Sequence, residues 1–435
     1  MSHRLQILST LLLGGALGAA CGDNLTKACD PDEPGTICTL AGDGAEGYGG
    51  DNGPALAANL WWPQDTVIAP NGELWIQDFN NYLVRAVDSQ GEIRTVVGTG
   101  LLGDSPSPAQ GDRCPALEAD FNHTTSMLFH DGYLYMAAWH GSRIKRLNYA
   151  DMTLENFAGI GKRTLYFGDE GPAIEAAFDL PTAMAIDPDG NVAVMDQANQ
   201  VIRLIDQAGT IHRIAGKCVI ETAGPCANPV LCPGSDKYVC GNADGSGNPQ
   251  AYCGTNAGYV GTADCALGYA GDGGDALELR MGQEYGQMAH PSGRIVYDKA
   301  GNLIFADSTN HRIRKINKSD NIVNTIAGTG VAGFSGEGGP GTEAEINFPV
   351  DVAVGPDGGI YFADFGNSCI RKIDAAGVIT TIAGQCSPNP RDWGFEGDGG
   401  APTAAKLNQP SGIDLVGNKL YISDTYNSRI RVVNF

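Results

Sequence analysis

The sequence predicts an all-β fold, a six-bladed β-propeller closed by an N-terminal strand that pairs with the last blade. Six segments share the pattern D-x-x-N-x-x-I-R-x-I-[DN], and its Ile position recurs every 57 to 60 residues apart from one gap of 111. Gly supplies 61 of the 435 residues, about twice the usual share, which is typical of many tight turns. Repeats of this length built from short strands indicate blades around an axis. The Ile positions are Val84, Ile144, Ile202, Ile313, Ile370 and Ile430.

Each repeat unit predicts three or four short strands joined by hairpins. An apolar stretch with a Gly-containing turn precedes the motif, as in DTVIAPNGELWIQD, and a further strand follows it, as in ITTIAGQ. Short apolar runs separated by such turns are typical of antiparallel hairpins. The second unit departs from the pattern, because Ala138, Gly141 and Lys145 stand where the other units carry Asp, Asn and Arg.

The two ends of the chain predict how the repeat closes. The chain stops at RIRVVNF, where one more strand should follow, and the equivalent strand TICTLAGDG lies near the N-terminus. We expect Cys38–Gly42 to pair with Ile430–Phe435, because a closed ring removes an exposed sheet edge. A jelly roll or a β-sandwich is the alternative.

The motif D-x-x-N-x-x-I-R-x-I resembles the NHL repeat, and the recurring GDGGPA-type loops resemble those of bacterial and teneurin-type NHL propellers. The resemblance covers residues 36–435 except an insertion at 218–265. It implies the six-bladed fold. It implies little about activity, because NHL-like propellers include both interaction platforms and enzymes.

The N-terminal segment predicts export. Residues 1–20 combine a charged start with an apolar run that is too short to cross a bilayer and ends in small residues, as in a signal peptide. LGAAC resembles a bacterial lipobox, although Gly18 stands where Leu is usual, and it makes Cys21 the expected lipidation site. Residues 21–35 would then be a lipid-anchor linker, and the protein a lipoprotein of a bacterial cell envelope, at the periplasm or cell surface, touching the membrane only through its anchor. An ordinary secretory signal is the alternative.

Twelve cysteines fit an oxidising compartment. Six of them lie in the insertion without any CxxC spacing, so we expect three disulfides there rather than a zinc ribbon, with their pairing left open. A Cys29–Cys38 bond would clip the N-terminal arm to the propeller, and Cys114 is the candidate for an unpaired thiol. The disulfide candidates are Cys29, Cys38, Cys218, Cys226, Cys232, Cys240, Cys253, Cys265, Cys369 and Cys386.

The charge balance excludes one class of partner. The formal net charge is −22, and no basic block interrupts the acidic background. Nucleic acid binding needs clustered Lys and Arg against phosphates, so we expect no nucleic acid partner.

Acids that recur in nearly every unit are interpreted as structural. Asp at the first motif position can bond turn amides, and the recurring Arg suits pairing between blades. Carboxylates in the Gly-rich loops are also expected to support turns, with calcium binding as the alternative. The motif acids are Asp78, Asp196, Asp307, Asp364 and Asp424, and the loop acids are Asp51, Asp112, Asp169, Asp272, Glu337 and Asp398.

Residues that differ between units are the better site candidates. The position just before each innermost strand should ring one mouth of the central channel and carries Trp62, His123, Leu180, His290, Phe348 and Gln409. Two positions later come Gln64, Thr125, Thr182, Ser292, Val350 and Ser411. The neighbouring turns add Trp139, His140, Phe365 and Tyr426, and the insertion adds Tyr238, Tyr252 and Tyr259. Aromatic groups with a few polar ones are typical of a binding surface.

The favoured hypothesis is therefore a non-enzymatic binding module without a cofactor, whose partner is a protein, peptide or glycan at the cell envelope. The alternative is a metal-dependent lyase or hydrolase, motivated by a resemblance to peptidylglycine α-amidating lyase and to lactonase propellers. In that case His123 and His290, or Asp65 and Asp351, would hold zinc or calcium at the channel mouth.

Overall fold

The computed structural model describes residues 29–106, 112–163, 166–218, 267–285 and 289–435, and the backbone of residues 230–231 and 238–239. The predicted signal peptide and Cys21 lie outside these residues. So do Cys226, Cys232, Cys240, Cys253 and Cys265, together with Tyr252 and Tyr259, while Tyr238 is described only in its backbone. In the described part of the chain, no helix has the length and apolar character needed to cross a membrane.

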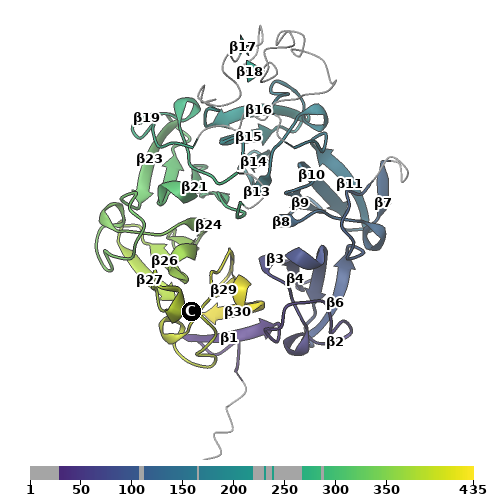
Figure 1. Cartoon of the computed structure of the whole chain (residues 1–435), viewed down its shortest axis with the longest axis vertical. Helices are drawn as coiled ribbons and strands as arrows, with labels where there is room; N and C mark the ends of the chain where they lie inside the picture. Colours follow the sequence, from purple (N-terminus) through teal and green to yellow (C-terminus); the bar gives the residue numbers. More distant parts are fainter. Residues whose placement is uncertain are drawn as a thin grey trace, which may run out of the picture.

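Six antiparallel sheets stand around a central axis, as the sequence predicts (Figure 1). Blade 1 contains β2 (Gly53–Pro54), β3 (Pro63–Ile68), β4 (Leu74–Asp78), β5 (Leu83–Val87) and β6 (Glu92–Val97). Blade 2 contains β7 (Arg113–Pro115), β8 (Thr124–His130), β9 (Tyr133–Ala138), β10 (Arg143–Asn148) and β11 (Thr153–Ala158). Blade 3 contains β12 (Gly171–Pro172), β13 (Pro181–Ile186), β14 (Val192–Asp196), β15 (Val201–Ile205) and β16 (Thr210–Ala215).

The second half of the ring repeats this plan. Blade 4 contains β19 (Gly274–Asp275), β20 (Ile295–Tyr297), β21 (Leu303–Asp307), β22 (Arg312–Ile316) and β23 (Ile322–Ala327). Blade 5 contains β24 (Pro349–Val354), β25 (Ile360–Asp364), β26 (Cys369–Ile373) and β27 (Ile379–Ala383). Blade 6 contains β28 (Gly412–Val416), β29 (Lys419–Asp424), β30 (Arg429–Asn434) and β1 (Thr36–Ala41). A small hairpin of β17 (Val230–Leu231) and β18 (Tyr238–Val239) belongs to the insertion between blades 3 and 4.

Single turns of 3₁₀ helix punctuate the loops. Those in the motif turns between the second and third main strands of a blade are η2 (Phe79–Asn81), η7 (Ser308–Asn310), η9 (Phe365–Asn367) and η12 (Thr425–Asn427). Those in the loops between blades are η1 (Ala55–Ala57), η3 (Ala116–Glu118), η4 (Ala173–Glu175), η6 (Ala276–Glu278), η8 (Gly341–Glu343), η10 (Pro390–Asp392) and η11 (Pro402–Ala404).

The predicted closure is confirmed. Strand β1 runs antiparallel to β30, with Thr36 opposite Asn434 and Ala41 opposite Ile430, so the first strand of the chain is the outer strand of its last blade (Figure 1). A Cys29–Cys38 disulfide ties the preceding arm to this strand. Pairing gives β30 a neighbour on both sides, which leaves no open edge at the junction.

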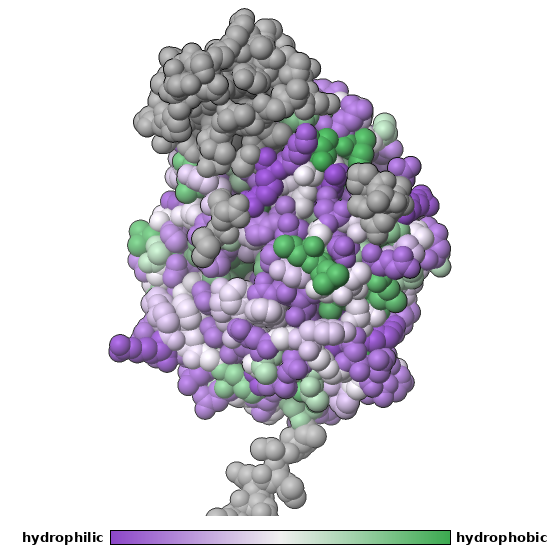
Figure 2. All heavy atoms as spheres, turned by 45° about the vertical axis from the view of Figure 1, so that its right-hand side comes forward, coloured by the Kyte–Doolittle hydropathy of each residue, from purple (hydrophilic) through white to green (hydrophobic). Residues whose placement is uncertain are grey.

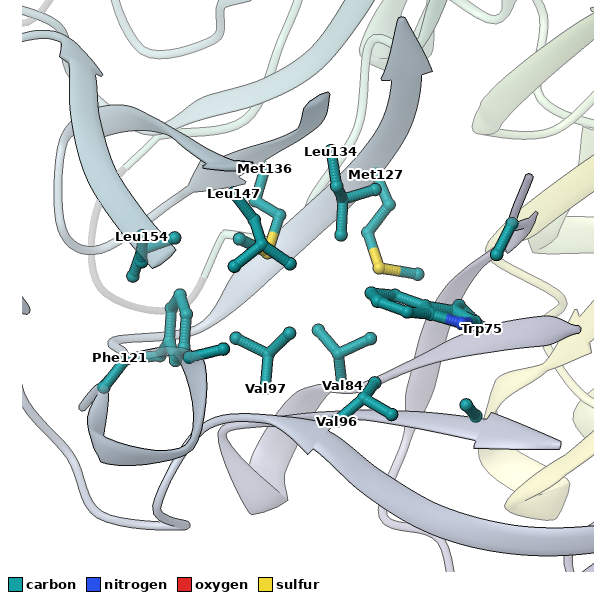
Figure 3. Packing of buried hydrophobic residues seen from close by; sticks show 14 of the residues in the cluster. Trp75, Val84, Val96, Val97, Phe121, Met127, Leu134, Met136, Leu147 and Leu154 are labelled. Carbon is teal, nitrogen blue, oxygen red and sulfur yellow. The ribbon is translucent and has the colours of Figure 1, made fainter. Parts of the chain in front are cut away.

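Neighbouring blades pack face to face through buried apolar side chains. Figure 3 shows the layer between blades 1 and 2, where Trp75 and Val84 face Met127 and Leu134. A comparable buried cluster lies at each of the other blade interfaces. Successive side chains of a strand point to opposite faces, and middle strands such as β4 and β14 are buried at every position, so both faces of a blade contribute to such layers.

The motif acids hold turns, as predicted. In blade 1 the Asp78 carboxylate accepts the backbone N–H of Trp61 at 2.8 Å and the Asn81 side-chain amide at 2.8 Å. The fully buried Arg85 donates to Asp51 at 3.0 Å and to the carbonyl of Asn59 at 2.8 Å. The arrangement recurs in blades 3 to 6 around Arg203, Arg314, Arg371 and Arg431.

These contacts correct one prediction. The recurring Arg ties the loop that enters a blade to that same blade, whereas the sequence pattern was interpreted as pairing between blades. An aromatic ring covers the guanidinium, as Tyr48 covers Arg85 at 5.4 Å. In blade 2 the recurring Arg is replaced by Lys145, which donates to Asp104 together with Arg143. Asp112 of the same loop is exposed.

The described cysteines form two complete disulfides. Besides Cys29–Cys38, a bond joins Cys369 of β26 to Cys386, 17 residues later. Cys218 is also disulfide-bonded. Cys114 is a free, buried thiol on β7, which confirms its interpretation as the unpaired cysteine.

Candidate binding face

One end of the propeller, here called the mouth face, carries the motif turns and the loops between blades. The two sets bond directly to each other, since Asn80 donates its N–H to the Trp61 carbonyl at 3.1 Å, and Tyr426 donates to Asn408 at 3.1 Å. The opposite end, here called the hairpin face, carries the turns that follow the innermost strands, such as Pro70–Gly72. Loops held on rigid strands are where propellers present recognition groups.

A shared backbone conformation positions the predicted mouth ring. The residues just before five of the innermost strands have positive φ, namely Trp62, His123, Leu180, Phe348 and Gln409, with values of 48° to 55°. Bulky side chains rarely adopt this left-handed conformation, which costs about 1 to 3 kcal/mol per residue. Its recurrence shows that the same backbone bend leads the chain into these five inner strands. His290 of blade 4 is not among the positive-φ residues.

Five of the predicted residues form a continuous set on blades 4, 5, 6 and 1, here called the aromatic arc: Trp62, Tyr426, Phe365, Phe348 and His290. The ring centroids of Trp62 and Tyr426 lie 4.8 Å apart, and those of Tyr426 and Phe365 lie 6.3 Å apart. Phe365 is 6.0 Å from Phe348 and 5.7 Å from His290. Edge-on and tilted contacts of this kind fix each ring against the next.

The remaining mouth aromatics form a second cluster around His123. Its ring lies 4.7 Å from Phe79 and 4.8 Å from Tyr82, and its Nδ1 lies 3.1 Å from Nδ1 of His140. Trp139 stacks on His140 at 4.2 Å. Burial lowers the pKa of His123 to about 4 and that of His140 to about 3, so both imidazoles are neutral at pH 7.

Two carboxylates that the sequence interpretation missed flank the aromatic arc. Glu46 accepts the Trp62 indole N–H at 2.8 Å, and Glu284 accepts both the backbone N–H and Nδ1 of His290 at 2.8 and 2.9 Å. Burial raises the pKa of the Tyr426 hydroxyl, and the charges of both carboxylates raise it further. Glu46 stands where the equivalent loop before blade 5 carries Ala332, and Glu284 lies in an extra stretch before the inner strand of blade 4, so neither acid belongs to the repeated pattern.

The predicted second ring, two positions deeper, is used to hold blades together. The Thr125 hydroxyl donates to the Thr182 carbonyl at 2.9 Å, and the Thr182 hydroxyl donates to the Ser292 carbonyl at 2.8 Å. Ser411 continues the pattern at the closing junction by donating to Gln64 at 3.3 Å. These hydroxyls therefore bond neighbouring blades to one another.

A buried ion pair bridges the central channel. Arg294 of blade 4 donates from Nη1 to the Asp65 carboxylate of blade 1 at 2.9 Å and from Nη2 to the Gln64 carbonyl at 3.2 Å. It also donates to the Thr125 carbonyl. Arg294 is 7% exposed and Asp65 is 4% exposed. One guanidinium therefore spans from one side of the ring to the opposite side.

Asp351 and Asp414 share this channel. The Asp351 carboxylate accepts the backbone N–H groups of Val352 and Ile413, each at 2.7 Å. Burial raises the pKa of Asp351 to about 7; Arg294 opposes this shift and Asp65 adds to it. Burial, together with the charges of Asp65 and Asp351, also raises the pKa of Asp414 to about 7. Two of these carboxylates, Asp65 and Asp351, thus interact with the buried Arg294 cation, while Asp414 meets only their negative charges.

The residues that could hold a metal, His123, His290, Asp65 and Asp351, interact with other protein groups. Asp65 and Asp351 do lie in one channel, but the positive charge there comes from Arg294. His123 pairs with His140, whereas His290 pairs with Glu284. Among the residues described, no three or more His, Cys, Asp or Glu side chains are grouped as metal ligands would be.

Replacing Asp414 with Asn is expected to stabilise the protein at alkaline pH. Its folded pKa lies above its ordinary value of 3.8, so the folded state binds more protons between about pH 4 and pH 7, and stability falls as pH rises through that window. We expect Asp414→Asn to raise the free energy of unfolding at pH 8 by up to about 4 kcal/mol and to leave it almost unchanged at pH 4. Denaturant unfolding at both pH values measures this, and an equal gain at both would contradict it.

Comparisons with known proteins agree with the repeat pattern. A profile described as the NHL repeat matches residues 347–373 and 407–433, in blades 5 and 6. The chain is 25% identical over 341 residues to the chloroplast protein SUPPRESSOR OF QUENCHING 1 of Arabidopsis thaliana, covering 78% of this chain and 27% of that protein. It is 24% identical over 367 residues to mouse teneurin-3, covering 74% of this chain and 13% of the relative. The chain thus spans a minor part of both relatives.

A solved structure shares the fold. The crystal structure described as an auxiliary nutrient binding protein from Bacteroides thetaiotaomicron superposes with a TM-score of 0.56 at 14% identity, covering 91% of this chain and 75% of the other. At this level of identity the likeness concerns the fold alone.

Proposed function

Since the chain carries NHL repeats and folds as a six-bladed β-propeller, it belongs with the NHL-repeat propellers, and we propose that it is a binding module that uses its mouth face. The observation that carries this proposal is the aromatic arc, which joins four blades on one face. Its rings are large contact groups already fixed by their neighbours, so binding would order few side chains.

The use of the other polar groups supports this proposal. The hydroxyls of the deeper ring hold neighbouring blades together, and Asp65 is paired with Arg294. The partly exposed members of the arc, such as Trp62, Phe348 and Tyr426, remain as contact groups. The ligand class is a protein, a peptide or a glycan, each of which stacks on exposed aromatic faces.

An envelope location belongs to the same proposal. The support is the signal-like stretch at residues 1–20, the lipobox-like Cys21 and the disulfides Cys29–Cys38 and Cys369–Cys386, since such bonds persist in oxidising compartments. Metabolic labelling with a radioactive fatty acid tests the anchor. We expect label in the wild type and none in Cys21→Ser, and a labelled Cys21→Ser protein would contradict lipidation at this residue.

Binding to arrays of peptides and glycans tests the mouth face. We expect the wild type to bind at least one array member, and Tyr426→Ala to weaken that binding about tenfold or more, as for a central aromatic contact. Phe435→Ala is the matched control, because Phe435 is an exposed aromatic residue whose N–H bonds Asn418 on the hairpin face. Equal loss in both variants, or no array binding at all, would overturn the proposal.

A further inference from the structure

From the aromatic arc and its two flanking carboxylates, we infer that the mouth face recognises a basic side chain, a lysine ammonium or arginine guanidinium, presented by a peptide or protein. This inference rests on the proposed binding function and names its ligand class. It distinguishes a cationic ligand from the neutral glycans that aromatic residues alone would also accept.

Three neighbouring rings of the aromatic arc form the apolar part of the proposed site. Trp62, Tyr426 and Phe365 follow one another at 4.8 and 6.3 Å, with interplanar angles of 42° and 67°. Trp62 and Tyr426 are partly exposed and tilted against each other, so both can present ring faces, whereas Phe365 is 5% exposed and supports Tyr426. A cation lying over such faces is attracted by the ring quadrupoles, most strongly over Trp.

Two carboxylates, Glu46 and Glu284, form the negatively charged part of the proposed site. Glu46 is exposed and is oriented by the Trp62 indole, while the Glu284 side chain is 33% exposed and is oriented by His290. Glu46 makes no ion pair within the described part of the chain, and the ion-pair partner of Glu284 there is His290. Two anchored negative charges therefore flank the arc without a Lys or Arg to neutralise them.

Two other cations on the mouth face, Arg312 and Arg429, donate to main-chain carbonyls and are paired with neither Glu46 nor Glu284. His123 and His140 are neutral at pH 7, because burial lowers the pKa of both. Arg163, on the loop between blades 2 and 3, lies 3.7 Å from Asp179. The formal net charge of −22 adds a long-range attraction for basic ligands.

Two short peptides of equal size test the charge requirement. We expect the blocked tripeptide Gly-Lys-Gly to bind at least about tenfold more tightly than Gly-norleucine-Gly. Isothermal titration measures both affinities, and raised salt should weaken the binding of the lysine peptide. Equal affinity of the two peptides would overturn the inference. Binding of butyltrimethylammonium without binding of the lysine peptide would overturn the assignment to a peptide side chain.

Variants of the two carboxylates test whether the lysine peptide binds at the aromatic arc. Glu46→Gln and Glu284→Gln should each weaken the lysine peptide about three- to tenfold while leaving thermal unfolding unchanged. Glu175→Gln is the matched control, because Glu175 is exposed on η4 between blades 2 and 3. An unchanged affinity in both arc variants would overturn the inference. Neutral glycan binding that Tyr426→Ala abolishes and these Gln variants preserve would also overturn it, while leaving the proposed binding function intact.

Discussion

Replacing Arg294 with Met is expected to lower the free energy of unfolding at pH 8 by about 3 to 5 kcal/mol, the usual cost of removing one partner of a buried ion pair. The Asp65 carboxylate would lose its cation while 4% exposed. The carbonyls of Gln64 and Thr125 would lose a donor as well. Met has a similar length, so the change tests charge and hydrogen bonding more than volume.

Denaturant unfolding at pH 8 and pH 5 measures this effect. The loss should be smaller at pH 5, because Asp65 and Asp351 have raised pKa values and take up a proton more readily once Arg294 is gone. Arg94→Met is the matched control, since Arg94 pairs with Glu73 while its side chain is 42% exposed, and such pairs contribute about 0 to 1 kcal/mol. A cost for Arg294→Met no larger than for the control would disprove the channel bridge.

Removing the closing strand is expected to destabilise the whole ring by more than about 5 kcal/mol. Strand β1 buries Ile37 completely against blade 5, which contributes about 2 kcal/mol, and it also supplies the hydrogen bonds along β30. Without it, β30 becomes an open edge that favours aggregation.

Two truncated chains isolate this effect. One starts at Thr36 with Cys38→Ser and keeps the strand, and the other starts at Gly42 and lacks it, so neither can form the Cys29–Cys38 bond. Calorimetry should show a melting temperature at least about 10 °C lower for the chain that starts at Gly42. Equal melting temperatures would show that the ring holds without its outer strand.

The repeat made the fold predictable from sequence. A motif recurring every 57 to 60 residues defines blades, and the missing final strand reappears as TICTLAGDG. The mouth ring was predictable for the same reason, because one backbone bend recurs before five of the innermost strands. Phe365 and Tyr426 could be proposed from their place in the motif turns.

Contacts between units were harder to predict. Arg294 is the single charged residue at its position in the repeat. The other units carry Thr66, Met127, Met184, Val352 and Ile413 there. Asp65, the partner of Arg294, lies 229 positions away, and no local pattern links the two. Glu46 replaces an Ala of the equivalent blade 5 loop, and Glu284 lies in an extra stretch of blade 4, so only the folded geometry shows that both acids lie beside the arc.

The arm that carries Cys29 leaves the molecule at a defined place. Asp32 pairs with Lys419, and its carbonyl accepts from Asn434, beside the turn that follows β28. That turn belongs to the hairpin face, whereas Trp62 and Tyr426 occupy the other end. Cys29 itself is bonded to Cys38 in the outer strand of blade 6, so any tether upstream of Cys29 would join the propeller at that strand rather than beside Trp62 and Tyr426.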